Sequence, residues 1–475
     1  MDGNVYLALD QGGHASRAIV FDGRGELIAQ AFAPIATLRP AAGQVEHDPE
    51  EVIESLLTAT ADVAEHCPAG VRVVAAGLAT QRSSIVCWDR QTGRALSPVI
   101  SWQDRRNAPF VEGLAAHATD VHARTGLVLS PHYGASKLRW CLDNIPAVAQ
   151  AANSGRLAFG PLSSFILFRL LDERPLVVDP ANASRTQLYS PTTRDWSPEL
   201  LSLFGIETRH LPRAVSSRYA FGSLVLGTDR LPLCVCTGDQ SAVPFAFGPP
   251  HFDSAYVNVG TGAFIQRPLD APMVAAPLLT SVVWSDAQRV TYVLEGSVNG
   301  AGSALDWFSE TEGIDAYRML ASLDASSVAS VRPPLFLNGI SGLGSPFWIA
   351  DFESRFVDTG TVEEKFIALL DSILFLIRVN LDEMQHRGPP LNQIVITGGI
   401  AGADVVCQRL ADLTSLPVLR PAEREATSRG LAFLVANQPA DFNAGGESRI
   451  FYPVPDVALL ERFLAWLKEM KQAAG

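Results

Sequence analysis

The chain opens with three short apolar segments separated by turns that contain glycine. The segments are NVYLALD, RAIVFD and ELIAQAFAPI. They are rich in apolar and β-branched residues and are bounded by glycine, which predicts a β-meander. EHDPEEVIESLLTATADVAEHC then predicts a helix with Asp48 as its N-cap and Pro49 at its first position. VRVVAAGLA predicts a buried strand, and SSIVCWD and ALSPVISW predict two shorter strands.

The opening pattern returns in the second half of the chain. Residues 105–230 read mostly as helix and loop, and LPLCVCTGD is an apolar run that ends on an acid. AYVNVGTGAFI is again an apolar run, a glycine-rich turn and an apolar run, and QIVITGG predicts a strand that ends in a Gly-Gly turn. Residues 363–387 have apolar positions at helical spacing and predict one long helix. The repeated unit predicts a duplicated α/β domain with a boundary near 247–254.

Length and charge narrow the class of protein. The 475 residues suggest two or three domains, and 47% hydrophobic residues allow large cores. The net charge of −13 argues against a nucleic-acid partner and against an anionic membrane surface. It does not exclude an anionic ligand, because a few local donors can hold a phosphate.

The cysteines and the N-terminal sequence indicate the cellular compartment in which we expect the protein. The N-terminus has no basic region before its short apolar run, and no apolar stretch approaches the length of a membrane span. Sparse cysteines in apolar runs, without a second pair of metal ligands, favour a reduced, cytoplasmic protein. They are Cys67, Cys87, Cys141, Cys234, Cys236 and Cys407.

Two glycine turns are candidate phosphate sites. Asp10 stands just before Gly12 and Gly13, but the stretch lacks a Walker A ending, and a strand rather than a helix follows. A glycine hairpin can offer backbone N–H groups to a phosphate, and the acid can hold a metal-bound water. A plain hairpin turn explains the same residues, with His14 tolerant of unusual backbone angles. Residues 259–262 have the same ambiguity, and facing halves would let both turns hold one polyphosphate.

Three side chains at predicted strand ends are candidates for the acceptor chemistry. Asp239 follows a buried strand, where it could take the proton of an attacking hydroxyl or cap the next helix. Arg82 lies at a strand end, where α/β sheets bind ligands, or is a surface arginine paired with an acid. Trp102 could stack on a sugar or belong to the core. Arg105 and Arg106 read as a solvated face.

Taken together, the segments resemble the FGGY carbohydrate kinases, and among them the glycerol kinases most. The resemblance runs in order through nearly the whole chain. It rests on LALDQGGHASRAIVFD, GQVEHDPEEV, TQRSSIVCWDRQTGRALSPVISWQDRR, TGLVLSPHYGASKLRW, DPANASRTQLYSPTTRDWSPELL, TGDQSA, VGTGAF, LEGSVNGAGSALDWF, SGLGSPFW and TGGIAGADVV. The resemblance implies an α/β fold of two actin-like (ribonuclease H-like) domains around a cleft. Residues 1–248 would bind the acceptor, residues 254–440 would bind the nucleotide, and 441–475 would form a tail.

The resemblance also implies roles for individual residues, with ATP and Mg²⁺ as cofactors and a homodimer or homotetramer as the assembly. The implied catalytic residues are Asp10, Arg17 and Asp239, with Asp239 as general base and with Asp10 and Asp239 at the metal. The implied acceptor site contains Arg82, Ser83, Trp102, His132, Asp239 and Gln240. The implied nucleotide site contains Gly12, Gly13, His14, Ser16, Gly260, Thr261, Gly262, Gly398 and Gly399.

This sequence departs from the family pattern at several of these positions. Gly13 and His14 replace residues with hydroxyl groups, Ser83 stands where glycerol kinases have Glu, and His132 stands where they have Tyr. We therefore expect an ATP-dependent kinase of a small polyol or sugar, with glycerol not its best substrate. The alternatives are a ketopentose or other sugar as acceptor, a glycerol kinase with an unusual pocket, and a catalytically weak sensor that binds nucleotide or sugar.

Overall fold

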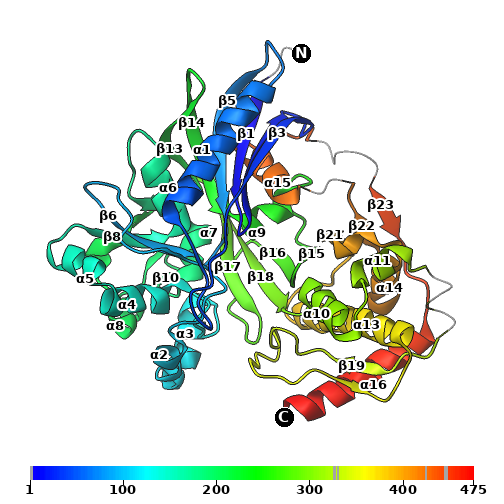
Figure 1. Ribbon diagram of the computed structural model, residues 1–475. Coiled ribbons are helices and arrows are strands. Elements are labelled where there is room, and N and C mark those ends of the chain that lie inside the picture. Colours follow the sequence, from blue (N-terminus) through cyan, green and yellow to red (C-terminus); the bar gives the residue numbers. More distant parts are fainter. Residues whose placement is uncertain (1–3, 325–327, 329–330, 423–424, 443–447) are drawn as a thin grey trace.

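Two large β-sheets, one in each half of the chain, organise the computed structural model (Figure 1). The structure describes residues 4–324, 328, 331–422, 425–442 and 448–475. Within these residues the first sheet has the order β13 (Arg218–Leu226), β14 (Asp229–Gly238), β5 (Arg72–Thr80), β1 (Asn4–Gln11), β2 (Ala15–Asp22), β3 (Leu27–Pro34). The second has the order β17 (Leu279–Ser285), β18 (Val290–Val298), β16 (Ala263–Leu269), β15 (Ser254–Val259), β21 (Gln393–Thr397), β22 (Val418–Arg420), β23 (Arg449–Phe451).

The two sheets share one topology, as the repeated sequence pattern predicted. In the first sheet β1 is antiparallel to β2 and parallel to β5, and β2 is antiparallel to β3. In the second sheet β15 is antiparallel to β16 and parallel to β21, and β16 is antiparallel to β18. The two glycine turns therefore occupy equivalent places, each joining the central strand of its sheet to the next strand.

The first half adds one smaller sheet and most of the short helices. The four-stranded sheet has the order β4 (Glu46–His47), β7 (Val99–Ile100), β6 (Ile85–Asp89), β8 (Leu157–Pro161). Two strand pairs join β10 (Tyr189–Ser190) to β11 (Asp195–Trp196) and β9 (Val177–Val178) to β12 (Arg213–Ala214). The helices are α1 (Pro49–His66), α2 (Ala108–Glu112), α3 (Ala118–Thr125), α4 (Gly134–Asn144), α5 (Pro146–Asn153), α6 (Leu162–Leu170), α7 (Pro180–Ala183), α8 (Pro198–Phe204) and α9 (Asp239–Ala242), with 3₁₀ turns η1 (Ala115–His117), η2 (Ser184–Thr186), η3 (Thr208–His210) and η4 (Val243–Phe245).

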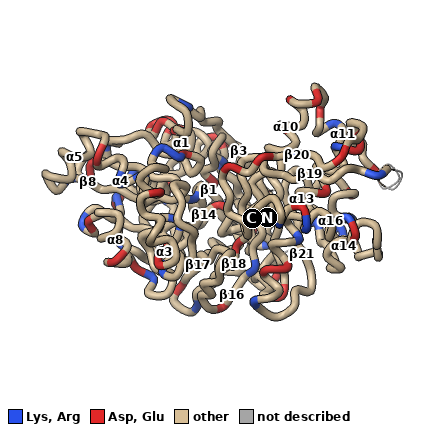
Figure 2. The backbone as a smooth tube through the Cα atoms, turned by 90° about the horizontal axis from the view of Figure 1, so that it is seen from below, with Lys and Arg blue, Asp and Glu red and all other residues tan. Residues whose placement is uncertain are grey.

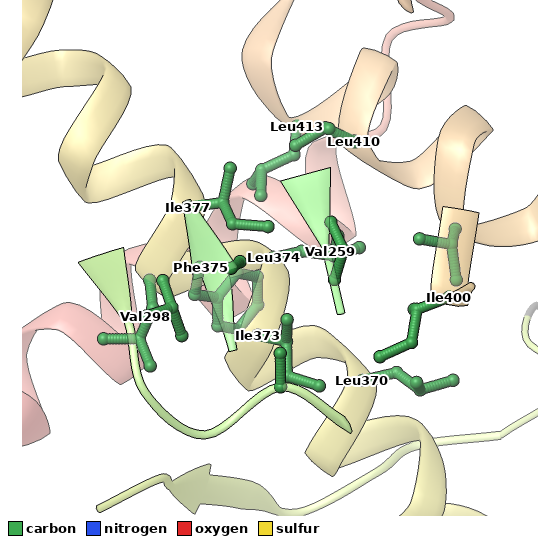
Figure 3. Close-up of a cluster of buried hydrophobic side chains, with 14 of the residues drawn as sticks. Val259, Val298, Leu370, Ile373, Leu374, Phe375, Ile377, Ile400, Leu410 and Leu413 are labelled. Carbon is green, nitrogen blue, oxygen red and sulfur yellow. The ribbon is translucent and has the colours of Figure 1, made fainter. Parts of the chain in front are cut away.

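The second half packs longer helices on its sheet. They are α10 (Gly302–Glu312), α11 (Ala316–Ser322), α13 (Val362–Gln385), α14 (Asp404–Thr414), α15 (Ala426–Val435) and α16 (Val457–Ala474), with the strand pair β19 (Leu335–Leu337) and β20 (Arg355–Val357) and the 3₁₀ turn η5 (Ile400–Gly402). Side chains of α13 pack beneath the end of β15, where Val259 and Ile400 meet Leu370, Ile373 and Leu374 (Figure 3). This apolar cluster supports the second glycine turn from below.

Several local predictions agree with the structure. The strands β8 to β13, within the segment read as mostly helix and loop, and the strands β17 and β18 were not predicted. Asp48 caps α1 by accepting a hydrogen bond from the backbone N–H of Glu50, and Pro49 takes the first position as predicted. α13 matches the predicted long helix and begins with a capping box between Thr361 and Glu364. The edge strand β13 was missed because its alternation is interrupted: three residues, 219–221, lie opposite a single residue of β14.

Helix α15 links the two halves. Although it follows β22 in the chain, it lies against β1 and β5 of the first sheet and against α9 (Figure 1). Its residues 431–435 share an apolar cluster with Ala8, Ala79 and Phe245 of the first half. Gly77 allows this close approach, because a Cβ atom there would stand 2.5 Å from a methyl carbon of Val435.

Charged side chains of both signs are spread over both halves of the tube drawing in Figure 2. All six cysteines, which lie among the described residues, carry free thiols. Over the described part of the chain, every helix falls short of the length and apolar character needed to cross a membrane.

Candidate active site

The first glycine turn places a carboxylate and a guanidinium group side by side. Asp10 at the end of β1 lies directly opposite Arg17 of β2 in the antiparallel pair, and their side chains are 3.7 Å apart. Asp10 is buried, whereas the Arg17 side chain is 41% exposed. Glu425, which comes just before α15, stands 3.8 Å from Arg17 on its other side. Arg17 therefore lies between a carboxylate from each half of the chain.

The remaining residues of this turn fall into two groups. The Gly12 N–H closes the turn on the carbonyl of Ala15, and His14 is exposed at its tip. Ser16 faces the other way: its hydroxyl is fully buried and lies 2.8 Å from the hydroxyl of Ser55 on α1. Successive strand residues point to opposite faces, so Ser16 and Arg17 cannot serve the same side. The Ser16 side chain, expected at the nucleotide, is thus directed away from the turn's charged face.

The predicted general base starts a short helix beside this hairpin. Asp239 follows the last residue of β14 and opens α9, whose N-cap is Gly238 without a side-chain cap. The carboxylate of Asp239 accepts a hydrogen bond of 2.6 Å from the N–H of Gln240 and lies 3.7 Å from Nε of Arg82. The Thr427 hydroxyl of α15 donates to the Asp239 carbonyl. Asp239 is therefore held by both halves while its carboxylate stays partly exposed.

The second glycine turn is built from backbone groups. The carbonyls of Gly260 and Thr261 accept hydrogen bonds of 2.9 Å from the N–H groups of Gly302 and Ser303 at the start of α10. A trans peptide points its N–H opposite to its carbonyl, so the N–H groups of Thr261 and Gly262 point away from α10. Such an array of free-pointing amides is the kind of group that binds phosphate oxygens.

Two further segments reach the same edge of the second sheet. Gly398 and Gly399 directly follow β21, the parallel neighbour of β15, so they end beside the Gly260 turn. Asn258 on β15 donates a hydrogen bond of 3.3 Å to the side-chain carbonyl of Gln240. Through this contact the predicted acceptor residue Gln240 touches the second half of the chain.

A buried ionic network joins Arg82 to the second half. Nη1 of Arg82 lies 2.9 Å from a carboxylate oxygen of Glu295 on β18, and Arg185 of η2 pairs with the other oxygen. Gln266 of β16 also donates to Glu295, at 3.1 Å. Burial alone would raise the pKa of Glu295, but the guanidinium groups of Arg185 and Arg82 lower it to about 2. Glu295 is therefore ionised at every physiological pH.

A buried lysine holds together the segments that carry the predicted acceptor residues Ser83, Trp102 and His132, here called the acceptor wall. Nζ of Lys137 on α4 donates to three carbonyls, those of Ser83 at 3.1 Å, Ser101 at 2.7 Å and His132 at 2.6 Å. These carbonyls belong to three separate segments, and the adjacent rings of Trp102 and His132 lie 5.8 Å apart, edge to face. Lys137 thus brings Ser83, Trp102 and His132 together.

The groups on this wall differ in charge and in hydrogen bonding. Burial, followed by Arg105 and Lys137, lowers the pKa of His132 well below its usual value, so its imidazole is neutral. The Ser83 hydroxyl is buried and has no hydrogen-bond partner among the described residues. Arg105 is exposed as expected, but the expectation for Arg106 was wrong. The Arg106 side chain is 2% exposed because Asp104 and Glu46, each at 2.7 Å, pair with it.

The two predicted metal ligands influence one another. Burial and the nearby Asp239 carboxylate raise the pKa of Asp10 to about 7, against the opposing effect of Arg17. Burial also raises the pKa of Asp239, which Arg82 opposes. A divalent cation would relieve this repulsion, and Mg²⁺ is typically held by one or two carboxylates plus phosphate oxygens. Among the described residues no group of three or more His, Cys, Asp or Glu side chains is arranged to hold a metal ion.

Several contributors to this site were not predicted from the sequence. Lys137, Arg185 and Glu295 are buried polar groups, and most of their partners lie far away in the chain. A lone acid inside the apolar run VTYVLEGSV was the available signal for Glu295. A separate cavity of about 840 Å³ lies elsewhere in the first half, between β13, β14 and residues 173–177, and none of the predicted site residues lines it.

Comparisons with known proteins match both halves of the chain. The model for the N-terminal domain of the FGGY family of carbohydrate kinases matches residues 5–246, and that for its C-terminal domain matches residues 255–438. Glycerol kinase from Citrifermentans bemidjiense is 36% identical over 442 residues, which cover 90% of this chain and 89% of the relative. Glycerol kinase from Rhodospirillum centenum is 36% identical over 447 residues, which cover 91% and 89%.

Solved structures share the fold. Plasmodium falciparum glycerol kinase with ADP superposes with a TM-score of 0.87 at 22% identity, covering 99% of this chain and 98% of that one. Gluconate kinase from Lactobacillus acidophilus gives a TM-score of 0.86 at 20% identity, covering 100% and 99%. Together with the duplicated sheets, this similarity confirms the expected α/β fold of two actin-like, ribonuclease H-like domains.

Proposed function

Because the chain belongs to the FGGY family of carbohydrate kinases, we propose that it phosphorylates a polyol or sugar larger than glycerol at the site around Asp239. The chain is a phosphotransferase that uses ATP and an alcohol acceptor, as its family does. Family membership and the convergence of Asp10, Arg17 and Asp239 favour an enzyme over a sensor that only binds ligands.

The proposed mechanism divides the work between the two turns and Asp239. Phosphoryl transfer depends mainly on positioning and on neutralising charge. Asp239 accepts the proton of the attacking hydroxyl, while Gln240 and Arg82 orient the acceptor. Arg17 and the amides of both glycine turns bind phosphate oxygens. Asp10 and Asp239 would hold Mg²⁺, which when bound supplies further positive charge against the phosphates.

The Ser83 hydroxyl, which has no hydrogen-bond partner among the described residues, is the main observation behind the proposal that the acceptor is larger than glycerol. Glycerol kinases have a Glu at this position, whose carboxylate reaches further than a serine hydroxyl. A buried polar group without a partner costs free energy, and a hydroxyl of a longer acceptor could pair with it. Neutral His132 offers that acceptor both a donor and an acceptor nitrogen. In this proposal residues 1–248 bind the acceptor, residues 254–440 bind ATP and 441–475 form the tail.

A screen of acceptors tests the proposal. ADP release would be measured with glycerol and with C4 to C6 polyols, ketoses and aldoses under one condition. We expect a larger acceptor to exceed glycerol in kcat/KM. Glycerol ahead of every other acceptor by about tenfold, roughly 1.4 kcal/mol, would instead make the protein a glycerol kinase with an unusual pocket.

Asp239→Asn is the matched variant for the screen. It should keep ADP binding and lose about 10²–10⁴-fold in kcat, the usual contribution of a positioned general base. Retention of more than about a third of kcat would remove Asp239 from that role. The homodimer or homotetramer implied by the resemblance remains a prediction, which sedimentation would test.

A further inference from the structure

We propose that Glu295, a residue of the nucleotide half, positions Arg82 for the acceptor across the junction of the two halves. The inference rests on the proposed function in one respect, namely that Arg82 binds the acceptor. It adds a residue that does not itself reach the reacting atoms and acts through its neighbour.

The position of Glu295 in the fold is the first argument. It lies on β18, directly opposite Gln266 of β16, in the interior of the second sheet. Its side chain is fully buried, yet both of its ionic partners, Arg82 and Arg185, come from the first half. The carboxylate of Glu295 is thus a buried point at which the two halves share charge, immediately beside the predicted acceptor site.

The geometry around Arg82 is the second argument. Its Nη1 is bound to Glu295 at 2.9 Å, which leaves its Nε facing Asp239 at 3.7 Å. Arg82 also packs closely on Gly238, where a Cβ atom would stand 2.7 Å from Cδ of the arginine. A planar guanidinium fixed at one nitrogen and along its stem presents its other nitrogens in a fixed direction. Glu295 therefore sets the direction in which Arg82 meets an acceptor next to the base.

The other partners of Glu295 hold the carboxylate still. Arg185 donates to Glu295 and also, at 3.1 Å, to the hydroxyl of Ser281 on β17. Gln266 donates to the same carboxylate oxygen that Arg82 uses. Both carboxylate oxygens of Glu295 accept hydrogen bonds, so the carboxylate is held in one orientation. This fixed carboxylate in turn fixes the orientation of the Arg82 guanidinium.

Glu295→Gln is the primary test, measured with whichever acceptor the wild type phosphorylates fastest. We expect kcat/KM for the acceptor to fall about 10²-fold through a higher acceptor KM and a lower kcat, since small misplacements of a binding group have effects of that size. The Kd for ADP should stay within about twofold, because Glu295 touches none of the proposed nucleotide residues.

Asp371→Asn is the matched control. Asp371 of α13 is also fully buried and also paired with two arginines, Arg409 and Arg462 at 2.5 and 3.1 Å, but within the second half only. It should lower the melting temperature and leave the acceptor KM unchanged. Equal acceptor kinetics in Glu295→Gln and Asp371→Asn would overturn the inference.

A double-mutant cycle with Arg82→Lys tests whether Glu295 acts through Arg82. If it does, Glu295→Gln should change kcat/KM by less than about threefold in the Arg82→Lys background. Fully additive losses would refute the positioning role. If Glu295→Gln does not fold, Gln266→Met, which removes one donor to the same oxygen and no charge, should raise the acceptor KM several-fold, and an unchanged KM would refute it.

These readouts separate the inference from the proposed function. A wild type that prefers glycerol would contradict the proposed acceptor class and leave the Glu295 comparison to be made with glycerol. A wild type that prefers a larger acceptor, combined with unchanged acceptor kinetics in Glu295→Gln, would refute the inference alone.

Discussion

The hairpins β1–β2 and β15–β16 lie at the same place in two sheets of the same topology, and they carry different chemistry. Asp10 stands two residues before Gly12, and Asn258 stands two residues before Gly260. Across the ladder Asp10 faces Arg17, whereas Asn258 faces Phe264. The first turn therefore carries an ion pair and the second turn carries an amide and a ring.

The difference shows which part of the chemistry the fold itself supplies. Backbone amides at a glycine turn come with the duplicated topology, so both hairpins can offer them. Charge does not come with it, because a buried carboxylate is costly unless a partner or a metal compensates for it. The chain places that cost at one turn only, where Asp10 has a pKa of about 7.

Asp10→Asn makes the first hairpin resemble the second and should have the largest effect. The amide cannot hold Mg²⁺ against the phosphates, and charge stabilisation by a metal amounts to several kcal/mol, so kcat should fall roughly 10³-fold. Turnover at varied Mg²⁺ would measure this, with Glu54→Gln on the exposed face of α1 as the control. An unchanged rate and unchanged Mg²⁺ dependence would reduce Asp10 to a turn residue.

The same variant should stabilise the metal-free protein in alkaline solution. The raised pKa of Asp10 means that its contribution to stability is complete below about pH 4 and is lost as the pH rises through about 7. Asparagine is neutral throughout, so at pH 8 the free energy of unfolding should rise by about 2–4 kcal/mol. Urea unfolding in EDTA at pH 8 and pH 4 measures this, and the gain should disappear at pH 4. An equal gain in the free energy of unfolding at pH 8 and at pH 4 would contradict the raised pKa of the buried Asp10 carboxylate.

Gly262→Ala and Gly13→Ala compare the backbones of the two turns. A Cβ atom on Gly262 would stand 2.8 Å from the carbonyl of Val298, whereas a Cβ atom on Gly13 meets nothing within 4 Å. The first variant should therefore lose about 1–3 kcal/mol of stability and weaken ADP binding, while the second should be close to neutral. Thermal unfolding and ADP titration would measure both. Equal losses would mean that the two turns are packed alike.

His14→Thr should have the smallest effect, because His14 is exposed at the tip of the charged turn. A threonine hydroxyl can donate one hydrogen bond to a phosphate oxygen, as the histidine ring can, so kcat and the KM for ATP should change by less than about threefold. Steady-state rates of the two proteins at varied ATP measure this. A loss of about tenfold or more would contradict this prediction and give His14 a larger part at the phosphates.

Local pattern was sufficient for most of the fold and for part of the site. Apolar runs and glycine turns predicted the two hairpins, α1 and α13, because strand and helix periods are properties of short segments. The alternation of strand residues also implied that the Ser16 side chain points away from the charged face, because Arg17, the next residue, lies on that face. The pair of Arg82 and Glu295 could not be predicted this way, because 213 residues separate the partners and only the packed sheets bring them together. The same holds for Lys137, whose three acceptors come from three loops.

The position of α15 has a consequence for exchanging segments between related kinases. The helix belongs to the second half by sequence and to the core of the first half by packing. A chimera joined near residue 250 would set an α15 from one parent against β1, β5 and α9 from the other, with Gly77 and Val435 in direct contact. The unit that can be exchanged intact is therefore discontinuous: the first half together with residues 426–435, grafted as two pieces around the remaining chain.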